Sequence, residues 1–200
     1  MRLFFKSLGY FVLLVILTGC ARGKEQQATT NSTLTIKPYE LTEKEELLIS
    51  KTGDPNVSFF TLDGKLKKGE DLKFSIEMYE NGKFKESLLT TTNEIDNKFN
   101  DTIISFSVRD HGPEAKMVSF VAGTPSSVAS TVHPNKMTNF SYNTLVEDKI
   151  KLKKDKPVYL AIWQGTTKDH FSTYTSENGK LPNLKNAELA FAYKVMLIEK

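Results

Sequence analysis

Apolar and polar side chains alternate along most of the chain beyond residue 56, and this period of two is typical of β-strands with one buried face. The pattern is clearest over residues 72–89, where two strand-like runs are separated by Asn81 and Gly82. An Asn-Gly pair favours a type I′ turn because both residues tolerate positive φ. Residues 72–89 therefore predict a β-hairpin.

Six further segments show the strand pattern. They are residues 57–62, 102–109, 115–122, 138–146, 158–164 and 188–199. The last of them has apolar residues on both faces, which is typical of a strand in the middle of a sheet. Between the strands, Asp63 and Gly64 predict a tight turn. The polar residues 90–101 predict a loop, residues 110–113 predict a turn, and residues 123–136 predict a long connection rich in Ser, Thr and Pro.

A single short helix is predicted before the strands, at residues 42–50. Thr42 and Glu45 match a capping box, in which each side chain satisfies a backbone N–H of the other residue. Residues 47–49 supply an apolar side, and Gly53 stands just past the end of the helix.

The whole pattern predicts an all-β fold, an antiparallel β-sandwich in a single domain over residues 36–200 that begins with the short helix. In architecture it resembles the immunoglobulin-like modules of exported proteins, although it lacks their Cys-Trp-Cys framework. Residues 66–76 and 152–162 also resemble each other, each with Leu-Lys-Lys before an alternating strand. Two explanations are open: an internal repeat, or two sandwich strands with similar roles.

The amino-terminal residues follow a different pattern, with Arg2 and Lys6 before an apolar run over residues 8–16. This is the layout of an export signal, and the run is too short for a good membrane span. It leads into Leu17-Thr18-Gly19-Cys20, which resembles the lipobox of bacterial lipoproteins. The resemblance implies a signal peptide at residues 1–19, cleavage by signal peptidase II, and a diacylglyceryl group with palmitate-type acyl chains on Cys20. The alternatives are an ordinary signal peptide, or a poor membrane anchor with a chance cysteine.

Residues 20–35 are polar and predict a flexible tether between the lipid and the domain. We therefore expect the protein to be anchored through Cys20 on the extracytoplasmic face of the cell membrane. Its many Lys, Asn and Ile residues are typical of an AT-rich genome, which suggests a Gram-positive source. Cys20 is the only cysteine, so once it is lipidated no thiol remains for a disulfide, a thiolate metal site or a nucleophile.

The net charge of the chain indicates which classes of partner are unfavourable. Without Arg2 and Lys6, the 27 basic residues become 25, against 24 acidic ones, a formal charge of +1. Nearly all the basic residues are lysines, and this composition argues against nucleic acid as a partner. No cofactor motif is present, and no cofactor is predicted.

Three histidines are the candidates for chemistry: His111, His133 and His170, each in a different predicted loop. None has metal-ligand spacing to another, so the sequence assigns no metal site and no catalytic residue. The alternative function is a small envelope hydrolase or metal-dependent enzyme that assembles these histidines with nearby carboxylates. It requires that two histidines and a carboxylate meet in one cleft.

Aromatic and polar residues gather after the strand that ends near Trp163. Trp163, His170, Phe171 and Tyr174 form the candidate binding site, because aromatic rings among hydroxyl and amide groups can stack on a sugar or grip a peptide. In the alternative interpretation, Trp163 and Phe171 only close the end of the sandwich. We therefore expect a non-enzymatic binding or interaction module of the cell envelope, with an envelope protein or cell-wall glycan as its partner.

Overall fold

A computed structural model describes residues 33–53, 56–93, 97–169 and 177–200, which belong to one folded unit, Ser32–Lys200. The predicted signal peptide, Cys20 and most of the predicted tether lie outside the described residues. Among the described residues, no helix has the length and apolar character needed to cross a membrane.

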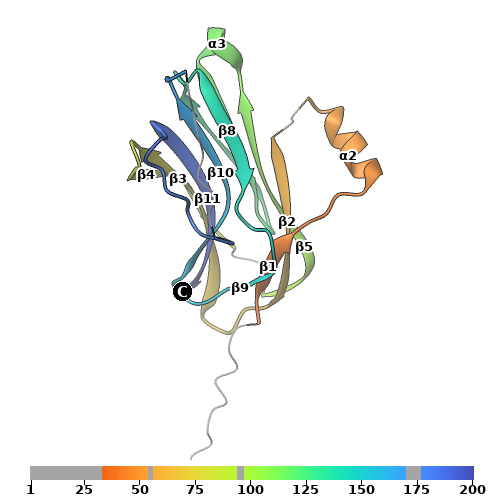
Figure 1. Cartoon of the computed structure of the whole chain (residues 1–200). Helices are drawn as coiled ribbons and strands as arrows, with labels where there is room; N and C mark the ends of the chain where they lie inside the picture. Colours follow the sequence, from red (N-terminus) through yellow and green to blue (C-terminus); the bar gives the residue numbers. More distant parts are fainter. Residues whose placement is uncertain (1–32, 54–55, 94–96, 170–176) are drawn as a thin grey trace, which may run out of the picture. The chain divides into compact units, whose positions relative to one another are not determined.

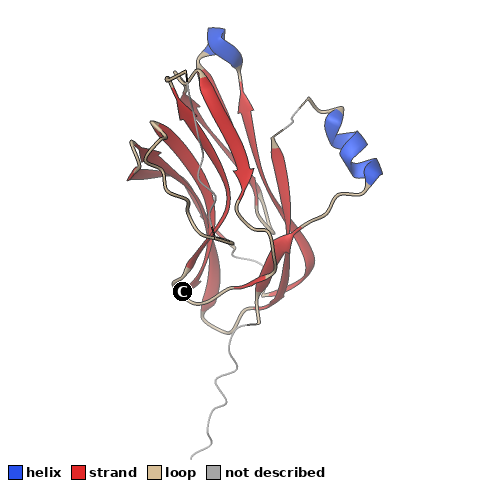
Figure 2. Cartoon of the chain, in the orientation of Figure 1, coloured by secondary structure: helices blue, strands red, loops and turns tan. Residues whose placement is uncertain are grey.

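The described strands form two sheets, drawn as red arrows in Figure 2. The first sheet has six strands in the order β7 (Val128–Pro134), β6 (Met117–Gly123), β5 (Lys98–Asp110), β2 (Val57–Lys65), β1 (Thr35–Pro38) and β9 (Ile150–Lys151). The second sheet has five, in the order β4 (Lys83–Thr92), β3 (Glu70–Glu80), β11 (Leu189–Glu199), β10 (Pro157–Thr166) and β8 (Asn139–Thr144). Neighbouring strands within each sheet are antiparallel.

Side chains that alternate inward along the strands hold the two sheets face to face. Phe106 of β5 stacks on Tyr193 of β11, with 5.0 Å between the ring centroids. Beside them, the ring of Phe120 in β6 lies 4.3 Å from that of Phe191 in β11. All four rings are buried, and burying a side chain of this size contributes roughly 1.5–3 kcal/mol. These contacts confirm the predicted all-β antiparallel sandwich.

The two clearest strand predictions are confirmed in the second sheet. β11 lies between β3 and β10, as its two apolar faces indicate (Figure 1). β3 and β4 form the predicted hairpin, and Asn81 (φ 50°) and Gly82 (φ 76°) form its two-residue turn. Because both residues have positive φ, the turn is of type I′.

The two similar sequence segments lie on opposite sides of β11, because β3 and β10 both pair with it. Each strand follows the same kind of turn, in which a backbone N–H donates to the carbonyl three residues earlier at 3.1 Å. A residue with positive φ occupies the same place in both turns: Gly69 (φ 84°) and Asp155 (φ 56°). The segments therefore have equivalent structural roles.

The part of the chain just before β11 covers some of the outer face of the second sheet. Leu184 and Ala187 from this segment pack with Ile162, Ala190 and Ala192 in a second apolar cluster. The outward-pointing side chains of Ala190 and Ala192 are therefore buried too, which explains why the first half of β11 is apolar on both faces.

The turn predicted at Asp63 and Gly64 is wrong, because both residues lie inside β2. The register of β2 against β5 shifts between Leu62 and Gly64, so the chain forms a bulge there. Gly64 has φ 119°, and a Cβ atom on it would lie 2.6 Å from the carbonyl oxygen of Thr33. Glycine is required because the first residues of the domain cross directly over this position. The domain accordingly includes the buried Leu34, which falls within the predicted tether.

The loops predicted at residues 90–101 and 123–136 are wrong in part. β4 continues to Thr92 and β5 begins at Lys98, while β7 occupies Val128–Pro134. β7 is an edge strand with no fully buried residue. Without a buried row, its Ser and Thr residues look like those of a loop in the sequence.

The predicted helix is confirmed as α2 (Glu43–Ser50), with Thr42 as its N-cap and Glu45 completing the capping box. No residue of α2 is buried, and the apolar side chains of Leu47 and Leu48 are exposed. A second short helix, α3 (Gly112–Ala115), occupies the turn predicted after β5. Figure 1 shows α2 on the connection between β1 and β2, apart from the strands.

Candidate functional site

A pocket of about 410 Å³ opens at one end of the sandwich. It is formed by the end of β7, the start of the connection to β8, the turn between β3 and β4, and the start of β11. The residues that line it are Glu80, Asn81, His133, Pro134, Lys136, Met137, Glu188 and Leu189. Segments that are far apart in the sequence therefore meet here, from both sheets.

His133 contributes an imidazole ring to this end pocket. Its Nδ1 lies 2.7 Å from the carbonyl oxygen of Pro134, and because a carbonyl oxygen only accepts, Nδ1 carries the hydrogen. The ring also stands edge-on to Phe191, with 5.1 Å between the centroids. In the neutral ring, Nε2 is therefore the acceptor that remains for a ligand.

Glu188 gives the end pocket a fixed negative charge. Its carboxylate accepts hydrogen bonds from the Thr167 hydroxyl at 2.9 Å, the Thr167 backbone N–H at 3.2 Å and the Thr166 hydroxyl at 3.1 Å. These bonds, above all that from the Thr167 side chain, lower the pKa of Glu188 below its ordinary value. Glu188 is therefore ionised at neutral pH, and it ties the end of β10 to the start of β11.

Opposite charges surround the rest of the pocket. Lys136 is exposed, and Glu80 forms an exposed ion pair with Lys85 at 3.4 Å. A pair this exposed is worth at most about 1 kcal/mol, so Glu80 can exchange Lys85 for a ligand cation. Leu189 and Met137 supply apolar surface between these charges. The pocket thus suits a ligand that has charged and apolar parts.

Trp163 lies behind the pocket rather than in it. Its side chain is fully buried, and its ring lies 5.8 Å from that of Phe140 and 5.7 Å from that of Phe191. A Cβ atom on Gly165 would lie 2.5 Å from Met137 Cγ and 2.6 Å from Trp163 Cη2. The absence of a side chain at Gly165 therefore lets Trp163 and Met137 pack beside the backbone of β10.

The sequence interpretation of Trp163 as an exposed stacking platform needs correction, because no face of its ring is open to a ligand. Its burial agrees with the alternative, in which it closes the end of the sandwich. The other three candidates, His170, Phe171 and Tyr174, lie outside the described residues. Trp163 therefore supports the pocket from behind, through Phe191, whose ring also contacts His133.

The described histidines do not meet. His111 Nε2 lies 2.9 Å from the hydroxyl of Ser119, whose side chain points to the outer face of the first sheet. His133 lies opposite the buried Val118 and contacts Phe191, so it is on the inner face. Within the described part of the chain, no group of three or more His, Cys, Asp or Glu side chains could hold a metal ion. His170 lies outside that part.

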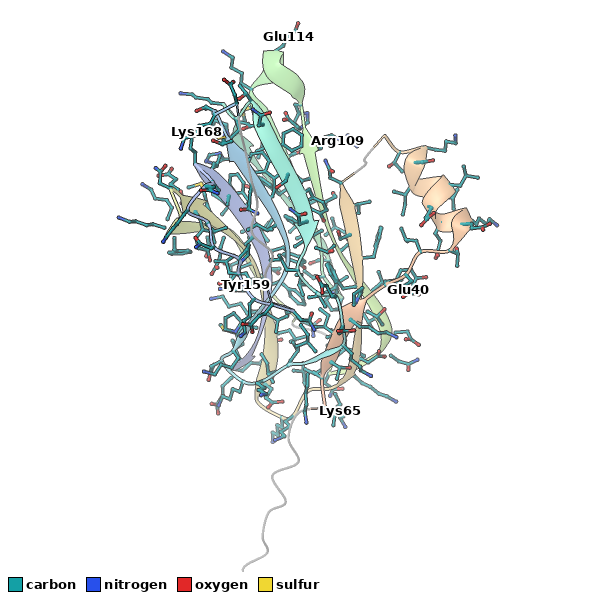
Figure 3. The ribbon with its side chains drawn as sticks, viewed as in Figure 1. Glu40, Lys65, Arg109, Glu114, Tyr159 and Lys168 are labelled. Atoms are coloured by element: carbon teal, nitrogen blue, oxygen red, sulfur yellow. The ribbon has the colours of Figure 1, made fainter. Side chains whose placement is uncertain are left out.

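A second polar cluster lies on the outer face of the second sheet, where Glu77 and Lys194 form an ion pair with side chains only 9% and 13% exposed. The Tyr79 hydroxyl donates to Glu77 at 2.7 Å, and that of Tyr159, labelled in Figure 3, donates at 3.2 Å. Burial raises the pKa of both tyrosines. Because three donors already satisfy the Glu77 carboxylate, this cluster is explained by its role in the sheet.

Sequence reasoning identified one residue of the end pocket, His133, and missed the rest. Glu80 ends a hairpin strand and Asn81 begins its turn, while Glu188 precedes Leu189, the first residue of the last strand. Nothing local distinguishes these residues from ordinary strand ends. Only the pairing of Glu80 with Leu189 brings them together.

Comparison with curated proteins gave no match, and comparison with solved structures gave none either. A family model of the YgaN domain matches residues 35–197, which extend from β1 into β11. The match covers both sheets and all the residues that line the end pocket. The chain therefore belongs to the YgaN domain family.

Proposed function

We propose that this protein is a lipid-anchored, extracytoplasmic binding module of the cell envelope, which holds a segment of another envelope protein in its end pocket. Anchoring rests on the lipobox-like residues 17–20, since two acyl chains on Cys20 are enough for stable membrane attachment. The binding role rests on the end pocket and its position in the domain.

The position of the pocket is the observation that carries the proposal. The first strand, β1, begins at Thr35 and pairs with the last part of β2, and β2 ends at Lys65. Figure 3 shows Lys65 at one end of the domain and Glu114 and Lys168 at the other. The pocket lies at this second end, because Glu80 ends β3, which starts beside the end of β2. β1, to which the predicted tether leads, therefore begins at the end of the domain opposite the pocket.

The chemistry of the pocket favours a peptide over a sugar. Sugar rings are usually held on exposed aromatic faces, but among the described residues no Phe, Tyr or Trp lines the pocket, and Trp163 is buried. Lys136 and Glu188 instead offer opposite charges on either side of apolar surface. A peptide segment with a charged and an apolar side chain matches both features, while cell-wall glycan is the rival ligand.

Charge reversal at the pocket tests this role. Lys136→Glu changes an exposed side chain of the pocket, and Lys153→Glu makes the same change on an exposed side chain at the opposite end, in the turn before β10. The full-length protein and both variants are immobilised, and binding of separated envelope proteins and of purified cell-wall glycan is measured. We expect Lys136→Glu to weaken capture of a protein about 3- to 10-fold, equivalent to roughly 0.7–1.4 kcal/mol, and Lys153→Glu to leave it unchanged.

Two results would contradict the proposal. Equal binding by Lys136→Glu and Lys153→Glu would show that the pocket is not the site. Binding of glycan that depends on Lys136 would keep the site but show that the ligand class is wrong.

Cys20→Ser tests the anchor separately. The substitution removes the sulfur that the acyl group requires, so we expect the protein to be released into the medium or to keep its signal peptide. Cell fractionation and gel mobility report both outcomes. Normal processing together with membrane retention would refute lipid anchoring through this residue.

A further inference from the structure

β7 is an edge strand without the usual protection against pairing with another chain. Edge strands are commonly protected by charged residues, bulges or shortness. Among the other edge strands that the structure describes, β4 carries three charged residues and two register shifts, β9 has only two residues, and β8 has six residues without a charge. β7 has seven residues, Val-Ala-Ser-Thr-Val-His-Pro, with no Lys, Arg, Asp or Glu among them. Its free edge is therefore a ready template for a further strand.

The hydrogen bonds at the two ends of β7 show which backbone groups face this free edge. The Asn135 N–H donates to the Lys116 carbonyl at 2.7 Å, and the Thr124 N–H donates to the Ser127 carbonyl at 2.8 Å. Hydrogen-bonded pairs alternate in an antiparallel ladder, so the odd-numbered residues from 127 to 135 direct their N–H and C=O groups toward β6. The groups of the even-numbered residues, Val128, Ser130 and Val132, point the other way.

The side chains of these three residues are symmetric about Ser130. Val128 is 74% exposed and Val132 is 54% exposed, and both lie on the same face of the strand as Ser130 because side chains alternate. We propose that β7 pairs antiparallel with β7 of a second copy of this chain, with Ser130 opposite Ser130 and Val128 opposite Val132. The two first sheets then form one continuous sheet across a two-fold axis.

Among the possible registers, this one pairs the outward-facing backbone groups of Val128, Ser130 and Val132 most completely. The two-fold axis must lie midway between the two copies of one residue. If the pairing shifted by one residue, each side chain would lie opposite a side chain on the other face of the sheet. Centring on Ser130 joins three residue pairs by about six N–H···O bonds, with valine opposite valine in two of them. Centring on Thr131 would place Val128 opposite Pro134, which has no N–H to donate.

A second copy fits this edge because the strand is self-complementary. In a two-fold pair the residue on the axis meets its own copy, so a charge there would meet a like charge. β7 has no such charge, and Ser130 on the axis is small enough to face itself. The pairing does not involve the end pocket, so it stands or fails independently of the proposed ligand.

Cysteine cross-linking tests the pairing and its register together. In a hydrogen-bonded antiparallel pair, opposite Cα atoms lie about 5.5 Å apart, which is within the range of a disulfide. The full-length chain carrying Ser130→Cys is expressed in bacterial membranes, exposed to mild oxidation, and examined on a non-reducing gel. We expect a disulfide-linked dimer. The unsubstituted chain is run in parallel to report any dimer formed through Cys20.

Val128→Cys is the matched control, because it lies on the same exposed edge. In the proposed register, two such cysteines lie four residues out of step, about 13 Å apart along the strands, so Val128→Cys alone gives no dimer. Co-expression of Val128→Cys with Val132→Cys restores a cross-linked dimer. The proposal is overturned if Ser130→Cys forms no dimer, or if Val128→Cys alone forms as much dimer as Ser130→Cys.

Discussion

Tyr193 makes the stability of the domain sensitive to alkaline pH. Its ring is fully buried, stacked on Phe106, and its hydroxyl donates to the Gly123 carbonyl at 3.3 Å. Burial raises the pKa of this hydroxyl far above its ordinary value. Above about pH 10 the unfolded chain releases the phenolic proton while the folded protein keeps it, so the free energy of unfolding falls as the pH rises.

The loss of stability at high pH corresponds to the release of one proton, from the Tyr193 hydroxyl, on unfolding. Each pH unit above about 10 removes about 1.4 kcal/mol from the free energy of unfolding through Tyr193. Tyr193→Phe abolishes this loss, but it also removes the hydrogen bond to Gly123, which costs about 1 kcal/mol at neutral pH. The variant is therefore less stable than the wild type at pH 8, and the two stabilities cross at about pH 10.7.

Urea unfolding followed by tryptophan fluorescence measures both stabilities, since Trp163 is the only tryptophan and is buried. Burial also raises the pKa of Tyr79 and Tyr142, so both proteins lose stability at high pH, and the difference between them isolates Tyr193. If the free energies of unfolding of the wild type and of Tyr193→Phe fall in parallel between pH 8 and 11.5, without converging, the proposed role of Tyr193 is refuted.

Two further substitutions test the packing behind the pocket and the buried ion pair. Gly165→Ala places a Cβ atom against Met137 and Trp163, so we expect a loss of about 1–3 kcal/mol, measured by urea unfolding; an unchanged midpoint would show that the chain relaxes freely there. Lys194→Ala leaves the Glu77 carboxylate buried without its cation, and we expect a loss of about 3–5 kcal/mol. Adding Glu77→Gln to that variant should recover most of this stability, and no recovery would argue against a charge effect.

Local signals predicted the parts of the fold that depend on short-range geometry. The Asn81-Gly82 turn follows from the positive φ that both residues adopt, and the start of α2 follows from the Thr42–Glu45 capping box. The prediction at Asp63-Gly64 used the same reasoning and was wrong. There the positive φ of Gly64 serves a bulge beneath Thr33, and no local pattern distinguishes a bulge from a turn.

The end pocket was beyond the reach of sequence reasoning for a different reason. Its residues are placed by pairings between strands that are distant in the sequence, such as Glu80 with Leu189. Trp163, the one member of the predicted aromatic site that the structure describes, is buried, and aromatic rings mark both cores and binding surfaces. Burial alone separates these two roles, and burial is a property of the packed sheets.

Alternation and turn chemistry act between neighbouring residues, so the sequence alone predicts the all-β class, the central place of the last strand, and the hairpin at residues 81–82. The folded structure was needed to show that Trp163 is core, that hydrogen bonds from Thr166 and Thr167 keep Glu188 ionised, and that β7 lies at the edge of its sheet. These properties depend on which strands pair and which faces meet. Such contacts join residues far apart along the chain, so no local pattern encodes them.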